Sequence, residues 1–124
     1  MLTYDLVVLG SGPAGEKGAA TAAAFGKRVA VVEGDPNVGG ASTNTGTLPS
    51  KTLRETALAL SGLRARELYG VDLSLRREAT VGDFLYHENR VKRKERGRVL
   101  DTLQRGQVDL HSGYGRFEDA HTVV

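Results

Sequence analysis

The sequence contains no cysteine among its 124 residues. Within this chain, that absence excludes a disulfide scaffold, a zinc site built on cysteine, a thiol nucleophile and a dithiol redox relay. Long apolar runs are also missing, because none approaches the ~20 residues of a membrane-spanning helix. Met1–Leu9 has neither the basic start nor the apolar core of a targeting signal. We therefore expect a cytoplasmic protein with no membrane partner.

A large excess of one charge is lacking as well, since 17 Lys and Arg residues against 15 Asp and Glu residues give a net charge of +2. Hydrophobic residues make up 40% and charged residues 26%, which excludes a wholly disordered or collagen-like chain. The length suits one small domain rather than two. Sixteen glycines in so short a chain need a structural reason.

The first third of the chain predicts a strand, a helix and a second strand. Thr3–Leu9 is rich in Val and Leu and bounded by glycine, so we expect the buried central strand of a parallel sheet. Glu16–Gly26 is an alanine-rich helix, and Arg28–Glu33 is a second buried strand. This order implies a right-handed crossover. The expected fold class is α/β, with a Rossmann-like βαβ unit.

The rest of the chain predicts two long helices and a small β segment. We expect a loop over Gly34–Leu48 and then a helix from Pro49 to about Tyr69. A break over Gly70–Thr80 should precede a second helix, which Thr80 and Asp83 would cap. Short strands should follow over Val108–Val124, with turns at Gly113 and His121.

Residues 10–15 read Gly-Ser-Gly-Pro-Ala-Gly and match the pattern G-x-G-x-x-G. The pattern alone is weak, but it lies between a buried strand and a helix, and Glu33 ends the next strand. This arrangement is typical of a dinucleotide-binding site, in which Gly10 would permit the tight turn, Gly12 would let the pyrophosphate of the dinucleotide approach the backbone, and Gly15 would allow close helix packing. The helix amino terminus would attract the phosphates, and Glu33 would accept hydrogen bonds from the adenosine ribose of the same ligand. Alternatively, the glycines only form a tight turn.

Four motifs in order resemble the amino-terminal FAD-binding segment of the pyridine nucleotide-disulphide oxidoreductases. They are GSGPAG at 10–15, Glu33, the string from Gly39-Gly40 through Gly46 to Pro49-Ser50-Lys51, and Gly113-Tyr114-Gly115-Arg116-Phe117. The resemblance covers essentially the whole chain. It implies that residues 1–124 form part of an FAD-binding domain whose partner is FAD.

The resemblance also implies roles for single residues. Gly40, Ala41 and Ser42 would lie along the flavin, and Tyr114 with Gly115 would meet the adenine edge. Lys51 would lie beside the hydride-accepting nitrogen of the flavin, one helical turn beyond Thr47. These two are the candidate catalytic residues. The full set of candidate cofactor-binding residues is Gly10, Gly12, Pro13, Ala14, Gly15, Glu33, Gly40, Ala41, Ser42, Gly46, Thr47, Lys51, Tyr114 and Gly115.

Ser42 and Thr47 occupy the positions at which the family normally has its redox-active cysteine pair. The family resemblance therefore implies transhydrogenase-like hydride transfer between NAD(P)H and FAD without a disulfide. An unassigned flavin oxidoreductase of the same group is an alternative, as is a dihydrolipoamide dehydrogenase-related fragment acting as a non-catalytic FAD-binding or structural module. Family members are several times longer, so we expect an amino-terminal fragment that completes no hydride-transfer cycle alone. NAD(P) binding and a homodimer would belong to a full-length form.

Residues 90–98 carry six Arg or Lys side chains around the single acid Glu95. A basic helix of this kind can bind nucleic acid or an acidic partner. No aromatic residues are interleaved with the charges, so we favour a solvated helix face over nucleic-acid binding. We predict no metal site.

Overall fold

The computed structural model describes residues 1–60 and 80–124. Strand β1 (Leu6–Leu9) leads through helix α1 (Pro13–Ala24) to strand β2 (Val29–Glu33). Two helices follow, α2 (Gly40–Asn44) and α3 (Thr47–Leu60). The long helix α4 (Val81–Arg105) then leads to strand β3 (Asp109–Ser112). The α/β fold class and the βαβ unit are confirmed.

The three strands form one parallel sheet in the order β1-β2-β3. We expected the first strand to be central and buried on both faces, and this was wrong. Helix α1 carries the chain to one side of β1, and α4 carries it further in the same direction, so β2 lies in the middle. Val29, Ala30 and Val31 of β2 are buried, whereas Leu6 and Leu9 at the ends of β1 are exposed.

The hydrophobic core lies on one face of this sheet. Because side chains alternate along a strand, Val8, Val29 and Val31 point to this face, where they join a cluster with Ala19 of α1 and Leu103 of α4. Helix α1 packs on β1 and β2, and the carboxyl-terminal part of α4 packs on α1 and β3. The opposite face carries Val7, Ala30 and Val32, which line a cavity described below.

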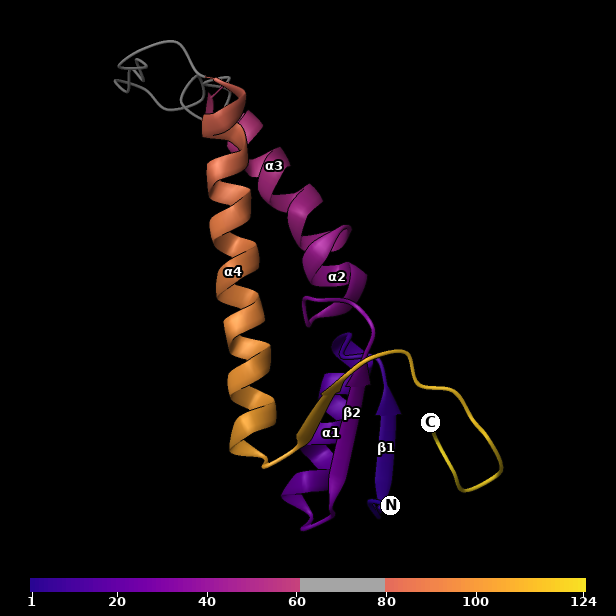
Figure 1. Cartoon of the computed structure of the whole chain (residues 1–124). Helices are drawn as coiled ribbons and strands as arrows, with labels where there is room; N and C mark the ends of the chain where they lie inside the picture. Colours follow the sequence, from indigo (N-terminus) through magenta and orange to yellow (C-terminus); the bar gives the residue numbers. More distant parts are fainter. Residues whose placement is uncertain (61–79) are drawn as a thin grey trace.

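Helices α3 and α4 pack side by side and extend away from the sheet (Figure 1). Helix α4 begins with a capping box, as predicted: the Asp83 backbone N–H donates to the Thr80 hydroxyl at 3.3 Å, and the Thr80 N–H donates to the Asp83 carboxylate at 2.8 Å. Helix α3 begins at Thr47, two residues before Pro49. Proline is accommodated there because the first amides of a helix have no intrahelical acceptor. The predicted break from Gly70, and the predicted helix after Leu60, lie outside the described residues.

Two further predictions need correction at the loop and at the end of the chain. The interval Gly34–Leu48, which we expected to be a loop, contains the short helix α2. Its residues are Gly, Ala, Ser, Thr and Asn, and this composition is more typical of a turn than of a helix. The Asn44 side-chain amide stabilises it by donating to the Val38 and Gly40 carbonyls at 3.1 and 3.0 Å. The final segment contributes β3 to the main sheet, and only then does it turn at Gly113 into a small antiparallel pairing of Phe117 with Val123.

The basic stretch of α4 is partly occupied by contacts within the chain. Arg98 donates two hydrogen bonds to Glu16 of α1, at 2.8 and 2.9 Å, and also pairs with Glu95. Lys92 contacts Glu88 at 2.6 Å, and Arg96 donates to Asn44 at 2.8 Å. Half of the predicted basic cluster, Lys92, Arg96 and Arg98, therefore makes contacts within the chain, so the helix face is less fully solvated than we expected. Among the described residues, no helix is long and apolar enough to cross a membrane.

Candidate functional site

The glycine-rich turn joins β1 to α1 at the carboxyl ends of the strands. Gly10 has a φ of +94°, which permits the turn, and its N–H donates to the Val32 carbonyl at 2.7 Å. A Cβ at Gly15 would lie 2.1 Å from the Gly10 carbonyl oxygen. The packing role predicted for Gly15 is therefore confirmed. The tight turn is what brings α1 close to β1.

Among the described residues, no side chain makes a capping hydrogen bond at the amino terminus of α1. Gly12 is the N-cap residue and Pro13 occupies the first turn, so no side-chain hydrogen bond caps the helix. The first amides of a helix that lack intrahelical partners attract anions, and the helix dipole adds to this attraction. The geometry is therefore suited to a phosphate group approaching Gly12, Ala14 and Gly15.

The Glu33 carboxylate lies at the end of β2 and faces back to this turn. Its Oε2 atom accepts two hydrogen bonds from Ser11, one from the backbone N–H at 2.8 Å and one from the hydroxyl at 2.5 Å. Its Oε1 atom accepts the Asp35 N–H at 2.9 Å. Partial burial raises the pKa of Glu33, but these hydrogen bonds outweigh it, and the net effect lowers the pKa below its ordinary value. Glu33 is consequently held as an oriented anion.

A cavity of about 380 Å³ opens beside Glu33. It brings together four of the predicted site residues, Gly10, Glu33, Tyr114 and Gly115, from segments about 100 residues apart. A Cβ on Gly34 would lie 2.6 Å from the Tyr114 ring, so this ring rests against the backbone that follows β2. The remaining lining residues are Leu9, Val32, Gly34, Asp35 and Gly113. Open α/β sheets bind ligands at this carboxyl edge.

The Gly39-Gly40 loop packs directly on the turn. The Gly39 N–H donates to the Ser11 hydroxyl at 3.1 Å, and a Cβ on Gly40 would lie 2.9 Å from the Gly12 Cα. The loop leads into α2, where Ala41 is exposed and Ser42 is half-buried. The structure therefore places the segment predicted for the flavin side next to the segment predicted for the phosphates.

The predicted catalytic residues lie further along the chain. Thr47 and Lys51 are both exposed and stand one turn apart at the start of α3, which follows the half-buried Gly46. Neither side chain lines the cavity beside Glu33. The structure thus places Thr47 and Lys51 of α3 outside the lining of this cavity, whereas Gly40 at the start of α2 packs on Gly12 of the turn.

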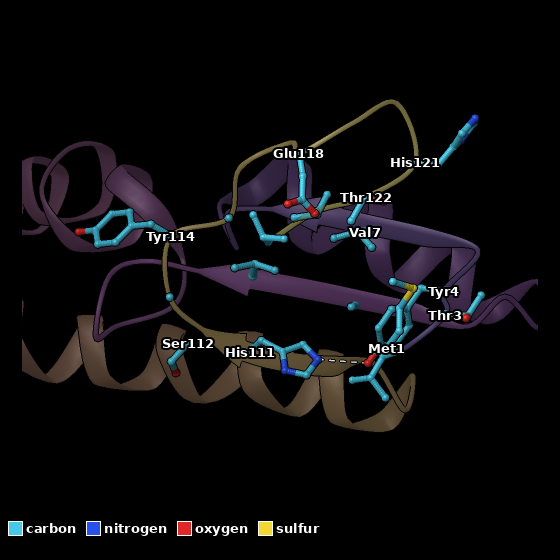
Figure 2. A pocket seen from close by; sticks show the side chains of 17 residues that line it. Met1, Thr3, Tyr4, Val7, His111, Ser112, Tyr114, Glu118, His121 and Thr122 are labelled. Atoms are coloured by element: carbon cyan, nitrogen blue, oxygen red, sulfur yellow. Dashed lines mark hydrogen bonds between the residues drawn. The ribbon is translucent and has the colours of Figure 1, made fainter.

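A larger cavity of about 940 Å³ covers the sheet face opposite the helices. Figure 2 shows Tyr114 toward one end of it and Tyr4 with His111 toward the other. The Tyr4 hydroxyl donates to Asp109 at 2.9 Å and contacts His111 at 3.1 Å, so these polar groups are already engaged with one another. The cavity extends along the middle of the sheet to its carboxyl edge, where it shares Tyr114 and Gly115 with the smaller cavity. Of the two cavities, the smaller one is lined by Gly10 and Glu33, and the larger one is not. We therefore take the smaller cavity as the candidate site.

The residues around the smaller cavity fit an adenine dinucleotide. Within the cavity, an oriented carboxylate suits the ribose hydroxyls, and an aromatic ring with open space suits the adenine. The uncapped amino terminus of α1, which follows Ser11 in the turn, does not line the cavity but suits the diphosphate. The cavity volume falls within the ~300–1,000 Å³ typical of ligand pockets.

The candidate site residues predicted from the sequence did not include Ser11, Gly34 or Gly39, although Ser11 and Gly39 stand within two of the motifs. Ser11 is fully buried and bonds to both Glu33 and Gly39. Its position between two glycines of the motif is the only sequence signal that it lies in the turn. Gly34 is needed because Tyr114 packs on it, and no local pattern shows that contact.

The comparisons with a protein family and with curated proteins agree with one another. The family described as pyridine nucleotide-disulphide oxidoreductase matches residues 4–124. The chain is 48% identical over 124 residues to a soluble pyridine nucleotide transhydrogenase of Mycobacterium tuberculosis and 39% identical over 120 residues to one of Marinomonas sp.. These alignments cover 100% and 97% of this chain but 26% of each relative, so the chain spans about a quarter of their length.

A solved structure shows the same likeness in three dimensions. The Cu(II) complex of the HOCl-induced flavoprotein disulfide reductase RclA from Escherichia coli aligns with a TM-score of 0.77 and 26% identity. That alignment covers 99% of this chain and 24% of the reductase chain. With a family match over nearly all residues and a shared Rossmann-like fold, the chain belongs to the pyridine nucleotide-disulphide oxidoreductase family.

Proposed function

We propose that residues 1–124 are the first part of the FAD-binding domain of a flavin-dependent oxidoreductase, and that this part binds the adenosine diphosphate half of FAD. The observation that carries the proposal is the oriented Glu33 carboxylate, which accepts two hydrogen bonds from Ser11 directly before the uncapped amino terminus of α1. The names of its relatives, which are transhydrogenases and a flavoprotein disulfide reductase, support it.

In this proposal, each group in the cavity and each group at the start of α1 has a defined role. The Glu33 carboxylate accepts hydrogen bonds from the ribose hydroxyls, which an anion does better than a neutral acid. The Ala14 and Gly15 amides donate to the diphosphate, and Gly12 has no Cβ to keep it away. Tyr114 and the Gly115 backbone border the adenine. Asp35 at the cavity rim adds a second negative charge that disfavours a further phosphate on the ribose.

The segment beyond Gly40 would serve the flavin side. When bound, FAD supplies an isoalloxazine ring that accepts and returns hydride. Gly40, Ala41 and Ser42 would border the flavin, and the Lys51 ammonium would stabilise negative charge on it. Ser42 and Thr47 are hydroxyl residues and cannot form a disulfide. We therefore propose transhydrogenase-like transfer between NAD(P)H and the flavin, with no dithiol relay through these two positions.

Flavin retention tests this proposal. The purified chain is equilibrated with FAD, and bound flavin is measured by quenching of its fluorescence and by its visible absorption after gel filtration. Glu33→Gln removes the anion but keeps the shape of the side chain, and should weaken binding about tenfold. Asp101→Asn removes an exposed acid of α4 and serves as the control.

Two results would contradict the proposal. The first is a folded wild-type chain that retains no FAD and whose thermal midpoint FAD does not change. The second is equal FAD affinity for the wild-type, Glu33→Gln and Asp101→Asn chains, because the carboxylate would then make no contact with the ligand.

A further inference from the structure

We propose that Ser11 is a positioning residue for the adenosine site: its buried hydroxyl orients the Glu33 carboxylate and at the same time holds the Gly39 backbone. The inference rests on the proposed function, since it concerns how the ribose-binding carboxylate is prepared for its ligand. Ser11 is the second residue of the motif G-x-G-x-x-G, a position at which the motif specifies no residue type.

The contacts of Ser11 are made with residues far away in the sequence. Its side chain is completely buried, with 0% exposure, so solvent does not compete for the hydroxyl. The hydroxyl donates its proton to Glu33 Oε2, 22 residues away, and accepts the N–H of Gly39, 28 residues away. A hydroxyl has one proton to donate and two acceptor positions. Its only donor capacity is therefore committed to Glu33.

Both hydrogen bonds from Ser11 reach the same carboxylate oxygen. The backbone N–H and the hydroxyl converge on Oε2 at 2.8 and 2.5 Å, whereas Oε1 accepts from Asp35. This pairing fixes the rotation of the carboxylate before any ligand arrives. An oriented acceptor binds a diol more tightly than a free one because less side-chain motion is lost on binding. The pKa of Glu33 is lowered in part by the same bonds, which agrees with a carboxylate held as an anion.

The second contact connects the two halves of the site. Gly39 precedes α2 with a φ of +101°, and a Cβ there would lie 2.5 Å from the Thr43 hydroxyl oxygen. Gly40, the next residue, packs against Gly12 of the turn. The Ser11 hydroxyl thus joins the ribose side of the site to the loop leading toward the flavin side. Its removal would leave the buried Gly39 N–H without this acceptor.

Ser11→Ala and Ser11→Cys test the inference without a ligand. Alanine removes the hydroxyl, and cysteine fills the same space with a much weaker donor. NMR titration of the Glu33 carboxyl carbon should give a pKa nearer the ordinary value of 4.5 in both variants, with faster exchange of the Gly39 amide proton. Ser50→Ala, at an exposed serine of α3, is the control. An unchanged Glu33 pKa in either folded variant would overturn the proposal.

A ligand comparison separates positioning from general damage to the site. Ser11→Ala should weaken ADP binding about tenfold but change the binding of 2′,3′-dideoxy-ADP less than twofold, because the dideoxy compound has no ribose hydroxyls for Glu33. Equal losses for both compounds, or no loss for either, would contradict the role of Ser11. If the wild-type chain binds neither ADP nor FAD, the proposed function fails, and the titration still decides whether Ser11 positions Glu33.

Discussion

Replacing Gly15 by alanine tests how closely α1 packs on β1. The new Cβ would lie 2.1 Å from the Gly10 carbonyl oxygen and 3.1 Å from a Val8 methyl carbon. Because the first of these is a backbone atom in a tight turn, helix or turn would have to shift by roughly 1 Å. Overpacking of this kind costs about 1–3 kcal/mol. This cost should exceed the stabilisation of up to ~1 kcal/mol that alanine gives over glycine through its higher helix propensity.

Gly18→Ala is the matched control for this experiment. It makes the same chemical change in the same helix, but a Cβ there meets nothing within 4 Å. Its effect should therefore be a stabilisation of about 0.5–1 kcal/mol. Urea unfolding followed by circular dichroism should show a lower midpoint for Gly15→Ala, by roughly 1 M, and a slightly higher one for Gly18→Ala. Equal midpoints for the two variants would refute the packing argument.

Three further predictions concern Glu33, the α1–α4 contact and the start of α4. Folding lowers the pKa of Glu33, so its carboxylate adds stability above the ordinary value of 4.5 and loses this effect as pH falls through the lowered folded value. Glu33→Gln should therefore unfold at lower urea concentration than wild type at neutral pH and at the same concentration at about pH 2. Arg98→Ala leaves the buried Glu16 without its bidentate partner and should cost about 1–2 kcal/mol in urea unfolding, whereas Arg93→Ala on an exposed part of the same helix should cost little. Thr80→Ala removes the capping box and should cost about 1 kcal/mol by the same measurement; unchanged stability would show that the first turn of α4 contributes nothing.

The βαβ unit was predictable because its signals are local. Val-rich strands, an alanine-rich helix and glycines at fixed spacing all belong to consecutive residues, and so does the acid that ends β2. The capping box of α4 was predictable for the same reason, since Thr80 and Asp83 lie three residues apart. What the local pattern did not give was the order of strands. The position of β2 between β1 and β3 depends on where α4 returns to the sheet.

Much of the candidate site depends on contacts between distant segments. Tyr114 reaches Gly34 because β3 pairs with β2 and the chain leaves both strands at the same edge. Ser11 reaches Gly39 because the loop after β2 folds back over the turn. Both contacts are tertiary, so neither has a periodicity or spacing in the sequence. Helix α2 was missed because its Gly, Ser and Thr residues favour turns unless side chains such as Asn44 satisfy the local carbonyls.

Mapping the contact surface of ADP on the ¹⁵N-labelled chain tests the central claim most directly. Titration with ADP should shift the amide signals of Gly12, Ala14 and Gly15 at the start of α1, together with those of Gly34 and Gly115 around the cavity. Shifts confined to the larger cavity, for example at Thr3 and His111, or no shifts at saturating ADP, would contradict the account.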